Sequence, residues 1–358
     1  MVKEYGYEYN AITDINLLSL VGWSGTDKKL WDAYALRSGR DALRMIAREY
    51  PNSTVFLPSL CCDSMVTPFE KYGCKIEYYP LTTGLCVDFS VLIHKLQLIK
   101  EPKLLLFYDY FAIKMFSPEQ LTDLKRKFND LILIEDITHT LLNAKNLEHH
   151  ADYTIASLRK WVNLPDGGLL WTKHKLNNSF LFDDSKFAEQ RLQAQCMRSE
   201  YAVTGDESLK SKYRYIFSNV SLLLDNNISP VKMTKYSYEL ACNTDWEHIN
   251  RQRKGNADIL SKILSGNQNI RIIDRDRGIN CSNLYVPILI ENRDEIQRKL
   301  SSKGIFNTII WPLRKEQMLV CSTAKYIVEH MLAVPCDQRY TKEDMLYIGK
   351  EIERVVNE

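Results

Sequence analysis

Residues 131–142 read LILIEDITHTLL, and the fold prediction starts from this stretch. Its first half is apolar at successive positions, which is typical of a central parallel strand that helices cover on both faces. Its second half puts Glu135, Asp136 and His139 just past the carboxyl end of that strand. Open α/β sheets bind ligands at this edge, so we expect a functional site here. The alternative is that Asp136 caps the following helix and His139 is a core residue.

The segments around this strand alternate between helix-like and strand-like patterns from about residue 38. Such alternation predicts an α/β layer structure whose central sheet is mostly parallel and lies between helices. The predicted elements are a helix at 39–50, strands at 54–58, 75–80 and 103–108, a helix at 117–128, and strands at 131–136, 152–158 and 167–172.

The second half of the chain has a different pattern. Long helical segments run from about 180 to 258, and a second short α/β pattern follows. Its strand-like segments are IRII (270–273), LYVPILI (284–290), FNTIIW (306–311) and MLAVP (331–335), with helices at 293–304 and 341–356. We therefore expect a large domain over 1–245, including a helical connector at about 180–245, and a small C-terminal α/β domain over 246–358. Helix-start capping sequences are predicted at 117–120 and 341–344.

Composition excludes several classes of protein. The 358 residues are 45% hydrophobic and 26% charged, with 47 Lys and Arg against 45 Asp and Glu, so the net charge of +2 attracts neither nucleic acid nor a membrane. The first residues lack the pattern of a secretion signal, and no apolar run is long enough to span a bilayer, so we expect a cytoplasmic protein. Nine cysteines occur without a C-x-x-C pair or a His/Cys cluster, which predicts free thiols and no metal site.

A second candidate segment reads SLRKWVNLPDGG at 157–168. It follows a predicted strand and contains Ser157, Lys160 and a pair of glycines. Taken alone, Lys160 would be an ordinary lysine on the protein surface. Together with Asp136 at a neighbouring strand end, however, it can face the same ligand.

The third candidate segment is SGRDAL at 38–43, where Gly39 opens a predicted helix. Backbone amides and the helix dipole make such a start suitable for a phosphate, although it can also be an ordinary cap. Neither a Walker sequence nor a dinucleotide fingerprint is present. A phosphate cradle, a carboxylate and an isolated lysine are what pyridoxal 5′-phosphate (PLP) requires: the lysine bonds to the cofactor, and the carboxylate keeps its ring nitrogen protonated.

These segments resemble fold type I PLP enzymes of the aspartate aminotransferase superfamily, and more narrowly the DegT/StrS family of sugar aminotransferases. The resemblance extends along nearly the whole chain through SGRDAL (38–43), VFLPSLCCDSM (55–65), LLLFYDYFAI (104–113), IEDITHTLL (134–142), SLRKWVNLPDGGLL (157–170), SPVKMTKYS (229–237), RKGNADIL (253–260) and LAVPCDQRYTKEDM (332–345). It implies that Lys160 is the lysine that bonds to PLP, that Asp136 contacts the pyridine nitrogen, and that His139 lies near the phenolic oxygen.

The resemblance also implies how the phosphate and the substrates are bound. The phosphate-binding positions correspond to Ser38, Gly39, Arg40 and Ser157, and to Lys232 from the other subunit of a homodimer. Substrate contacts would come from Tyr108, Tyr110, Trp311 and Arg314, for which core packing of the rings and simple exposure of Arg314 are the alternatives.

The implied activity is that of a PLP-dependent aminotransferase. It would move an amino group from an amino acid, with glutamate expected, to a keto-sugar carried on a nucleotide, in polysaccharide or glycan biosynthesis. Lys160 would act as general base and acid. One alternative is dehydratase-like PLP chemistry on a sugar, where that branch of the family has histidine in place of the lysine.

The other alternative is a non-catalytic fold type I binding protein. Two differences from the family motivate it. Leu60, Cys61 and Cys62 occupy the stretch where the family places an aromatic side chain that stacks on the cofactor, and Pro230-Val231-Lys232 stands where it often has Asn-x-Arg. The presence of Asp136 and Lys160 together favours catalysis.

Overall fold

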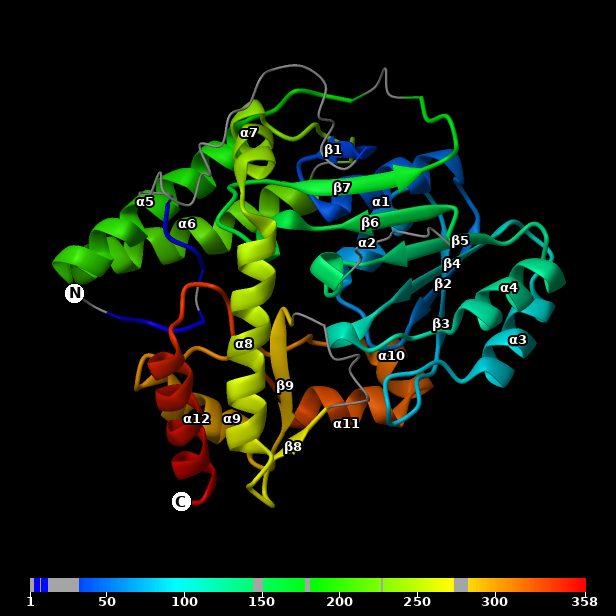
Figure 1. The fold of residues 1–358 in the computed structure, drawn as a ribbon. Coiled ribbons are helices and arrows are strands. Elements are labelled where there is room, and N and C mark those ends of the chain that lie inside the picture. The colour runs from blue at the N-terminus through cyan, green and yellow to red at the C-terminus, as the bar shows by residue number, and fades with distance from the viewer. Residues whose placement is uncertain are drawn as a thin grey trace.

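The computed structural model describes residues 3–6, 8–11, 32–143, 151–177, 181–226, 228–273 and 283–358, which form two sheets with helices around them (Figure 1). The larger sheet has the strand order β1-β7-β6-β5-β4-β2-β3. Its strands are β1 (Tyr34–Leu36), β2 (Thr54–Pro58), β3 (Lys75–Tyr79), β4 (Lys103–Tyr108), β5 (Ile132–Asp136), β6 (Tyr153–Ala156) and β7 (Gly168–Thr172).

Strand direction confirms the predicted, mostly parallel sheet. Strands β3, β2, β4, β5 and β6 run parallel to one another, whereas β7 is antiparallel to both β6 and β1. In the register, Tyr108 lies opposite Asp136, and Asp136 lies opposite Ile155. The carboxyl ends of β4, β5 and β6 therefore meet at one edge of the sheet, as the sequence predicted.

Helices surround the larger sheet and continue into a connecting region. The helices up to β7 are α1 (Gly39–Glu49), α2 (Asp63–Glu70), α3 (Phe89–Leu98) and α4 (Pro118–Lys127), with short 3-10 turns η3 (Tyr110–Ala112), η4 (Leu141–Asn143) and η5 (Leu158–Lys160). The next helices are α5 (Lys186–Thr204), α6 (Glu207–Asn226), α7 (Lys235–Asn243) and α8 (Trp246–Leu264). In Figure 1, α5 and α6 lie on the opposite side of the sheet from α3 and α4, and α8 runs from α7 down to the smaller sheet.

The smaller sheet is antiparallel, with the order β10-β9-β8. Its strands are β8 (Arg271–Ile272), β9 (Tyr285–Leu289) and β10 (Met331–Pro335), and its helices are α9 (Arg293–Ser301), α10 (Lys315–Val320), α11 (Ser322–His330) and α12 (Lys342–Val356). Helices α8 and α12 pack around a core that also contains Tyr5, from the start of the chain. The division at residue 245 stays a prediction.

The strand predicted at 306–311 is wrong. Thr308 makes one isolated antiparallel bridge to Ala333, and no strand forms over this segment. The amide of Phe306 donates to the carbonyl of Tyr5, at 2.8 Å, so the start of the segment is bonded to the N-terminal residues instead. Pro312 follows Trp311 and has no amide hydrogen to extend a ladder.

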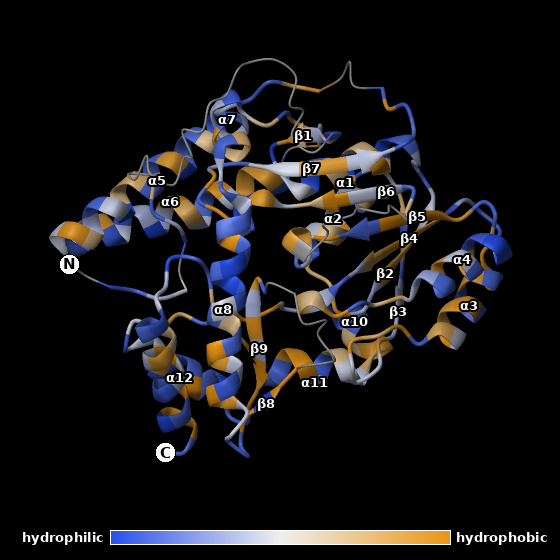
Figure 2. Ribbon diagram, viewed as in Figure 1, coloured by the Kyte–Doolittle hydropathy of each residue, from blue (hydrophilic) through white to orange (hydrophobic). Residues whose placement is uncertain are grey.

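Local capping explains where several helices begin. Ser38 caps α1 through its side chain, and both predicted capping boxes are present, at Ser117 with Gln120 and at Thr341 with Asp344. Figure 2 shows hydrophilic and hydrophobic residues side by side along the helices, whose apolar residues cover the two sheets. The eight cysteines in the described ranges are free thiols. None of the helices in those ranges is long and apolar enough to cross a membrane.

A close backbone approach joins β7 to the start of α1. A Cβ atom added at Gly168 would lie 2.2 Å from the carbonyl carbon of Ser38 and 2.6 Å from the amide nitrogen of Gly39. Both are backbone atoms and cannot move aside without displacing the first turn of α1. Only glycine fits at position 168.

We expect Gly168→Ala to lower the free energy of unfolding by about 2 kcal/mol or more, because it forces the backbone of β7 away from α1. Urea unfolding of the purified variant measures this loss. Gly255→Ala on α8 is the matched control, since a Cβ there has no atom within 4 Å. That control should gain about 0.5–1 kcal/mol from helix propensity alone. Equal effects of the two substitutions would contradict the close-approach argument.

Glu135, the neighbour of Asp136 on β5, is buried beside a second carboxylate. Lys114 bridges the two, at 2.5 Å from Asp109 and 3.7 Å from Glu135. Burial raises the pKa of Glu135 to about 7, and Asp109 adds to that rise while Lys114 opposes it. The folded protein thus keeps a proton on Glu135 at pH values where an unfolded chain has lost it.

The pKa of Glu135 predicts a pH-dependent stability. As pH rises from about 4.5 to 7, the unfolded chain ionises Glu135 and the folded chain does not, so stability falls across this window. Wild-type protein should lose about 1–3 kcal/mol more between pH 5 and pH 8 than Glu135→Gln, as measured by urea unfolding at both values. Identical losses in the two proteins would show that Glu135 ionises normally.

Candidate active site

The centre of the candidate site is Asp136, the last residue of β5. Its side chain is buried, and its Oδ1 accepts a hydrogen bond from the amide of Thr138 at 2.8 Å. Burial raises the pKa of Asp136, while the bond from Thr138 and the charge of Lys160 pull that pKa down. The strand end thus holds a buried carboxylate whose charge depends on cationic neighbours.

Lys160 lies at the end of η5, which follows β6, and it faces the same region as Asp136. Burial lowers the pKa of Lys160, and this effect is opposed by Cys62 and by Asp136. Among the described residues its ammonium has neither a hydrogen-bond partner nor an ion-pair partner. The two groups interact electrostatically, so Lys160 lies near Asp136, and the roles of both residues stay predictions. A lowered lysine pKa increases the fraction of neutral, nucleophilic amine.

Two residues that the sequence reasoning missed connect these segments. The hydroxyl of Thr138 accepts from the amide of Ser157, at 3.1 Å, and its carbonyl accepts from the indole Nε1 of Trp161, at 2.7 Å. The loop after β5 is therefore bonded directly to the turn that carries Lys160. Their signal in the sequence was only their position within the two candidate segments.

The start of α1 offers backbone donors next to Ser157. In the described structure the amides of Gly39 and Arg40 have no acceptor, as is usual for the first turn of a helix. A Cβ added at Gly39 would lie 3.8 Å from the Cβ of Ser157, so β6 ends beside these amides. The side chains at this start are already engaged: Ser38 Oγ donates to Asp41 at 2.5 Å, and Arg40 pairs with Asp225 at 3.0 Å.

Aromatic rings form one wall of the site. Tyr108 contacts His139, Tyr110 and Trp311, with ring centroids at 4.8, 4.9 and 5.7 Å. The hydroxyl of Tyr110 donates to the carbonyl of Leu60, whereas the buried hydroxyl of Tyr108 has no partner among the described residues. Burial, with a further effect of Lys160, holds the pKa of His139 well below its usual value, so this ring is neutral. Tyr108, Tyr110 and His139 are buried against one another, and Trp311 is the partly exposed ring of this wall.

The two adjacent cysteines have different surroundings. Cys61 is fully buried, and its carbonyl accepts from Nε2 of Gln317 at 2.9 Å; burial raises the pKa of its thiol. Cys62 is partly exposed, its Sγ lies 2.8 Å from the hydroxyl of Ser64, and it interacts electrostatically with Lys160 and Tyr108. Cys62 is therefore the cysteine that faces the candidate site.

Two predicted residues are paired with carboxylates outside this cluster. Arg314 donates to Asp63 at 2.5 Å and to Glu70 at 2.6 Å, so two carboxylates already neutralise its guanidinium. Lys232 pairs with Asp183 at 3.1 Å and is half exposed. The backbone of Lys232 forms an antiparallel bridge to Leu36, at the outer side of β1.

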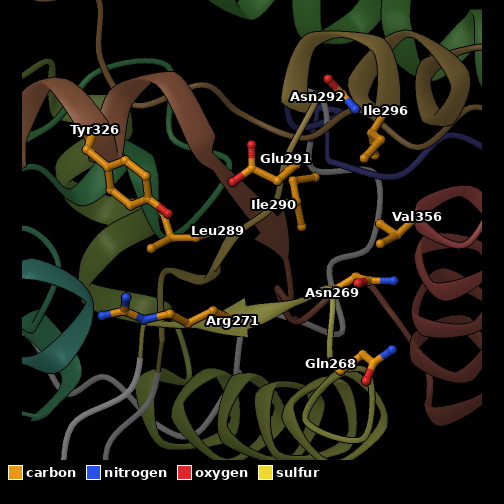
Figure 3. A pocket seen from close by; sticks show the side chains of 10 residues that line it. All are labelled: Gln268, Asn269, Arg271, Leu289, Ile290, Glu291, Asn292, Ile296, Tyr326 and Val356. Atoms are coloured by element: carbon orange, nitrogen blue, oxygen red, sulfur yellow. The ribbon is translucent and has the colours of Figure 1, made fainter.

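A separate pocket of about 330 Å³ opens on the smaller sheet, and Figure 3 shows the side chains around it. Amide side chains, one arginine and one tyrosine share its lining with aliphatic groups from β9, α9 and α12. No residue of the Asp136 and Lys160 cluster lines it. No group of three or more His, Cys, Asp or Glu side chains suited to a metal occurs among the described residues.

Comparison with known proteins identifies the fold. No protein-family model matches the sequence, and no curated protein matches it. Solved structures do match. A putative sugar aminotransferase, Spr1654 from Streptococcus pneumoniae in its PLP form, has a TM-score of 0.70 at 16% identity, over 99% of both chains. PseC from Helicobacter pylori, an aminotransferase involved in the biosynthesis of pseudoaminic acid, has a TM-score of 0.68 at 14% identity, over 99% of this chain and 100% of that chain.

A DegT DnrJ EryC1 StrS aminotransferase from Brucella abortus matches with a TM-score of 0.63 at 14% identity, over 91% of this chain and 86% of that chain. The agreement spans both sheets and the helices between them, because the longest matches cover almost every residue. This chain therefore has the fold of the PLP-dependent sugar aminotransferases, the fold that its sequence predicted.

Proposed function

We propose that this protein is a PLP-dependent aminotransferase of the DegT/StrS type. The observation that carries the proposal is made at the carboxyl edge of the sheet. Lys160, which has no bonding partner among the described residues, interacts electrostatically there with the buried Asp136. Support comes from the fold, which is shared with sugar aminotransferases solved in PLP and pyridoxamine phosphate forms. An edge of this kind is where open α/β sheets bind ligands.

The residues present fit PLP. The free amides of Gly39 and Arg40 would hold the phosphate together with Ser157 and the adjoining Ser38, since a helix start favours an anion. Asp136 would contact the ring nitrogen, and His139 would lie near the phenolic oxygen. When bound, PLP supplies an aldehyde that bonds to an amine and a cationic ring that withdraws electrons.

Each residue then has a defined task. Lys160, with its lowered pKa, provides a neutral amine that binds covalently and afterwards carries a proton to and from the substrate. Asp136 would be ionised beside a cationic partner, because an opposite charge lowers the pKa that burial has raised. The rings of Tyr108, Tyr110 and Trp311 form the wall against which a sugar would rest, and the free hydroxyl of Tyr108 would bind it. Arg314 would contact a substrate while its guanidinium stays bonded to Asp63 and Glu70.

The proposed substrates are an amino acid donor, glutamate, and a nucleotide-linked keto-sugar acceptor. This chemistry would serve polysaccharide or glycan biosynthesis in the cytoplasm. The support is that the matched structures include sugar aminotransferases, one of them involved in the biosynthesis of pseudoaminic acid. The Lys160 side chain favours amino transfer over dehydratase-like chemistry, which in this family uses histidine at that position.

Absorption spectroscopy tests the cofactor and the donor. Protein purified with PLP should show a visible band that Lys160→Ala abolishes, because the band requires the covalent bond to Lys160. Glutamate should bleach the band as the amino group passes to the cofactor. Lys173→Ala, at an exposed lysine just after β7, is the control and should keep the band.

The other outcomes have definite meanings. A Lys160-dependent band that glutamate leaves unchanged would exclude glutamate as the donor and favour a different PLP reaction. A wild-type protein without any band would contradict PLP binding and favour the non-catalytic binding protein.

We also propose a homodimer in which Lys232 serves the site of the other subunit. Exposed apolar side chains surround Lys232: Phe182 is paired with the segment at 231, and Ile228 precedes that segment. Apolar side chains grouped with a cation on one face are typical of an interface.

Sedimentation velocity should give a particle of twice the 41.7 kDa chain mass. Phe182→Asp should shift it toward the monomer, because a carboxylate would be buried in an apolar contact. Leu98→Asp, at an exposed leucine on α3 on the opposite side of the sheet, should leave the dimer intact. A wild-type monomer that binds PLP would contradict the shared site.

A further inference from the structure

The backbone carbonyl of Trp161, the residue after Lys160, accepts hydrogen bonds from three distant parts of the chain. The donors are the hydroxyl of Tyr9 at 3.0 Å, Nη2 of Arg253 at 3.0 Å and Nε2 of Gln338 at 2.9 Å. A carbonyl at the end of a helical turn has no partner within that turn. Here these three hydrogen bonds connect the N-terminal segment, α8 and the segment after β10 to the turn that carries Lys160, called the lysine turn below.

Arg253 is the centre of this arrangement. Its guanidinium is buried, and it also lies 4.8 Å above the ring of Trp161. All five of its N–H donors have an oxygen acceptor, and none of these acceptors is a carboxylate. The acceptors are Gln338 Oε1, the carbonyls of Asn283, Leu284 and Trp161, and the hydroxyl of Tyr9. A buried cation is tolerated only with complete hydrogen bonding, so these contacts fix its position tightly.

The indole of Trp161 extends the connection to the carboxylate. Its Nε1 donates to the carbonyl of Thr138, whose own amide donates to Asp136 Oδ1. Trp161 therefore contacts Arg253 through its carbonyl and ring, and the loop that holds Asp136 through its indole nitrogen. Trp161 therefore helps to hold both candidate catalytic groups, Lys160 and Asp136.

We propose that Arg253 is a positioning residue that sets the place of Lys160 relative to Asp136. It acts through the carbonyl of Trp161. Its other hydrogen bonds, to Asn283 and Leu284 before β9 and to Gln338 after β10, connect the position of Lys160 to the smaller sheet. This inference rests on the proposed function for the role of Lys160. The bonded network itself is independent of any cofactor.

The test uses full-length protein loaded with PLP, in wild-type form and as Arg253→Gln and Arg253→Lys. The measured quantity is the pH midpoint of the Lys160-dependent absorption band, which reports the surroundings of the lysine rather than turnover. Arg253→Gln should move the midpoint by about 0.5 pH unit or more, because the distance from Lys160 to Asp136 and Cys62 changes. It should weaken PLP binding by about 10-fold. Arg253→Lys, which keeps a cation and donors, should return both values toward wild type.

Arg293→Gln is the matched control. Arg293 is also a buried arginine of the second half of the chain, but its Nη1 donates to the carbonyl of Met331 and it does not contact the lysine turn. It should lower stability without moving the midpoint. Gln338→Met removes one donor to Trp161 and the acceptor of Arg253 Nε, and it keeps the proposal testable if Arg253→Gln does not fold.

Hydrogen exchange of the cofactor-free protein provides a second measurement. Amides of residues 157–166 should exchange about 10-fold faster in Arg253→Gln and Gln338→Met than in wild type or Arg293→Gln. Unchanged exchange together with an unchanged midpoint would overturn the positioning role. A wild-type protein without a PLP band would overturn the proposed function instead, and hydrogen exchange would still decide whether Arg253 holds the turn.

Discussion

The placement of a partly buried lysine near a buried carboxylate, at one edge of a parallel sheet, is the constraint on which the rest of this structure depends. Each charge alone would be costly in such surroundings, and burial shifts both pKa values toward the neutral forms. Neither Lys160 nor Asp136 is held by a direct bond to the other. Their separation is set by the backbone, through Thr138, Trp161 and the register of β5 with β6.

Aromatic side chains gather near Lys160 from parts of the chain other than the cysteine pair. The sequence lacks an aromatic residue at 60–62, yet the structure gathers Tyr108, His139 and Trp311 into one wall. Those rings come from the ends of β4 and β5 and from the segment before α10. These rings therefore meet although their elements lie far apart in the sequence, and Cys62 interacts electrostatically with one of them, Tyr108.

Local pattern predicted much of the fold, because buried strands and capped helices depend on nearby residues. The strands at β2 and β4 and the capping boxes at Ser117 and Thr341 were predicted in this way. The segment at 306–311 was not, since its partner is the N-terminal Tyr5 and no local pattern shows that pairing. The ion pairs of Arg314 were missed for the same reason: Asp63 and Glu70 are about 250 and 244 residues away in the chain. The five acceptors of Arg253 could likewise be found only in three dimensions.

The first residues of the chain have a practical importance for anyone who designs an expression clone. Tyr5 exchanges backbone hydrogen bonds with Gly304 and Phe306, and the amide of Gly6 donates to the hydroxyl of Tyr340 at 2.6 Å. Glu8 then pairs with Arg191 on α5, at 2.8 Å. Trimming this segment to aid crystallisation would remove its contacts with residues around the smaller sheet and with α5. An affinity tag is better fused after Glu358, where the last residues beyond α12 are exposed.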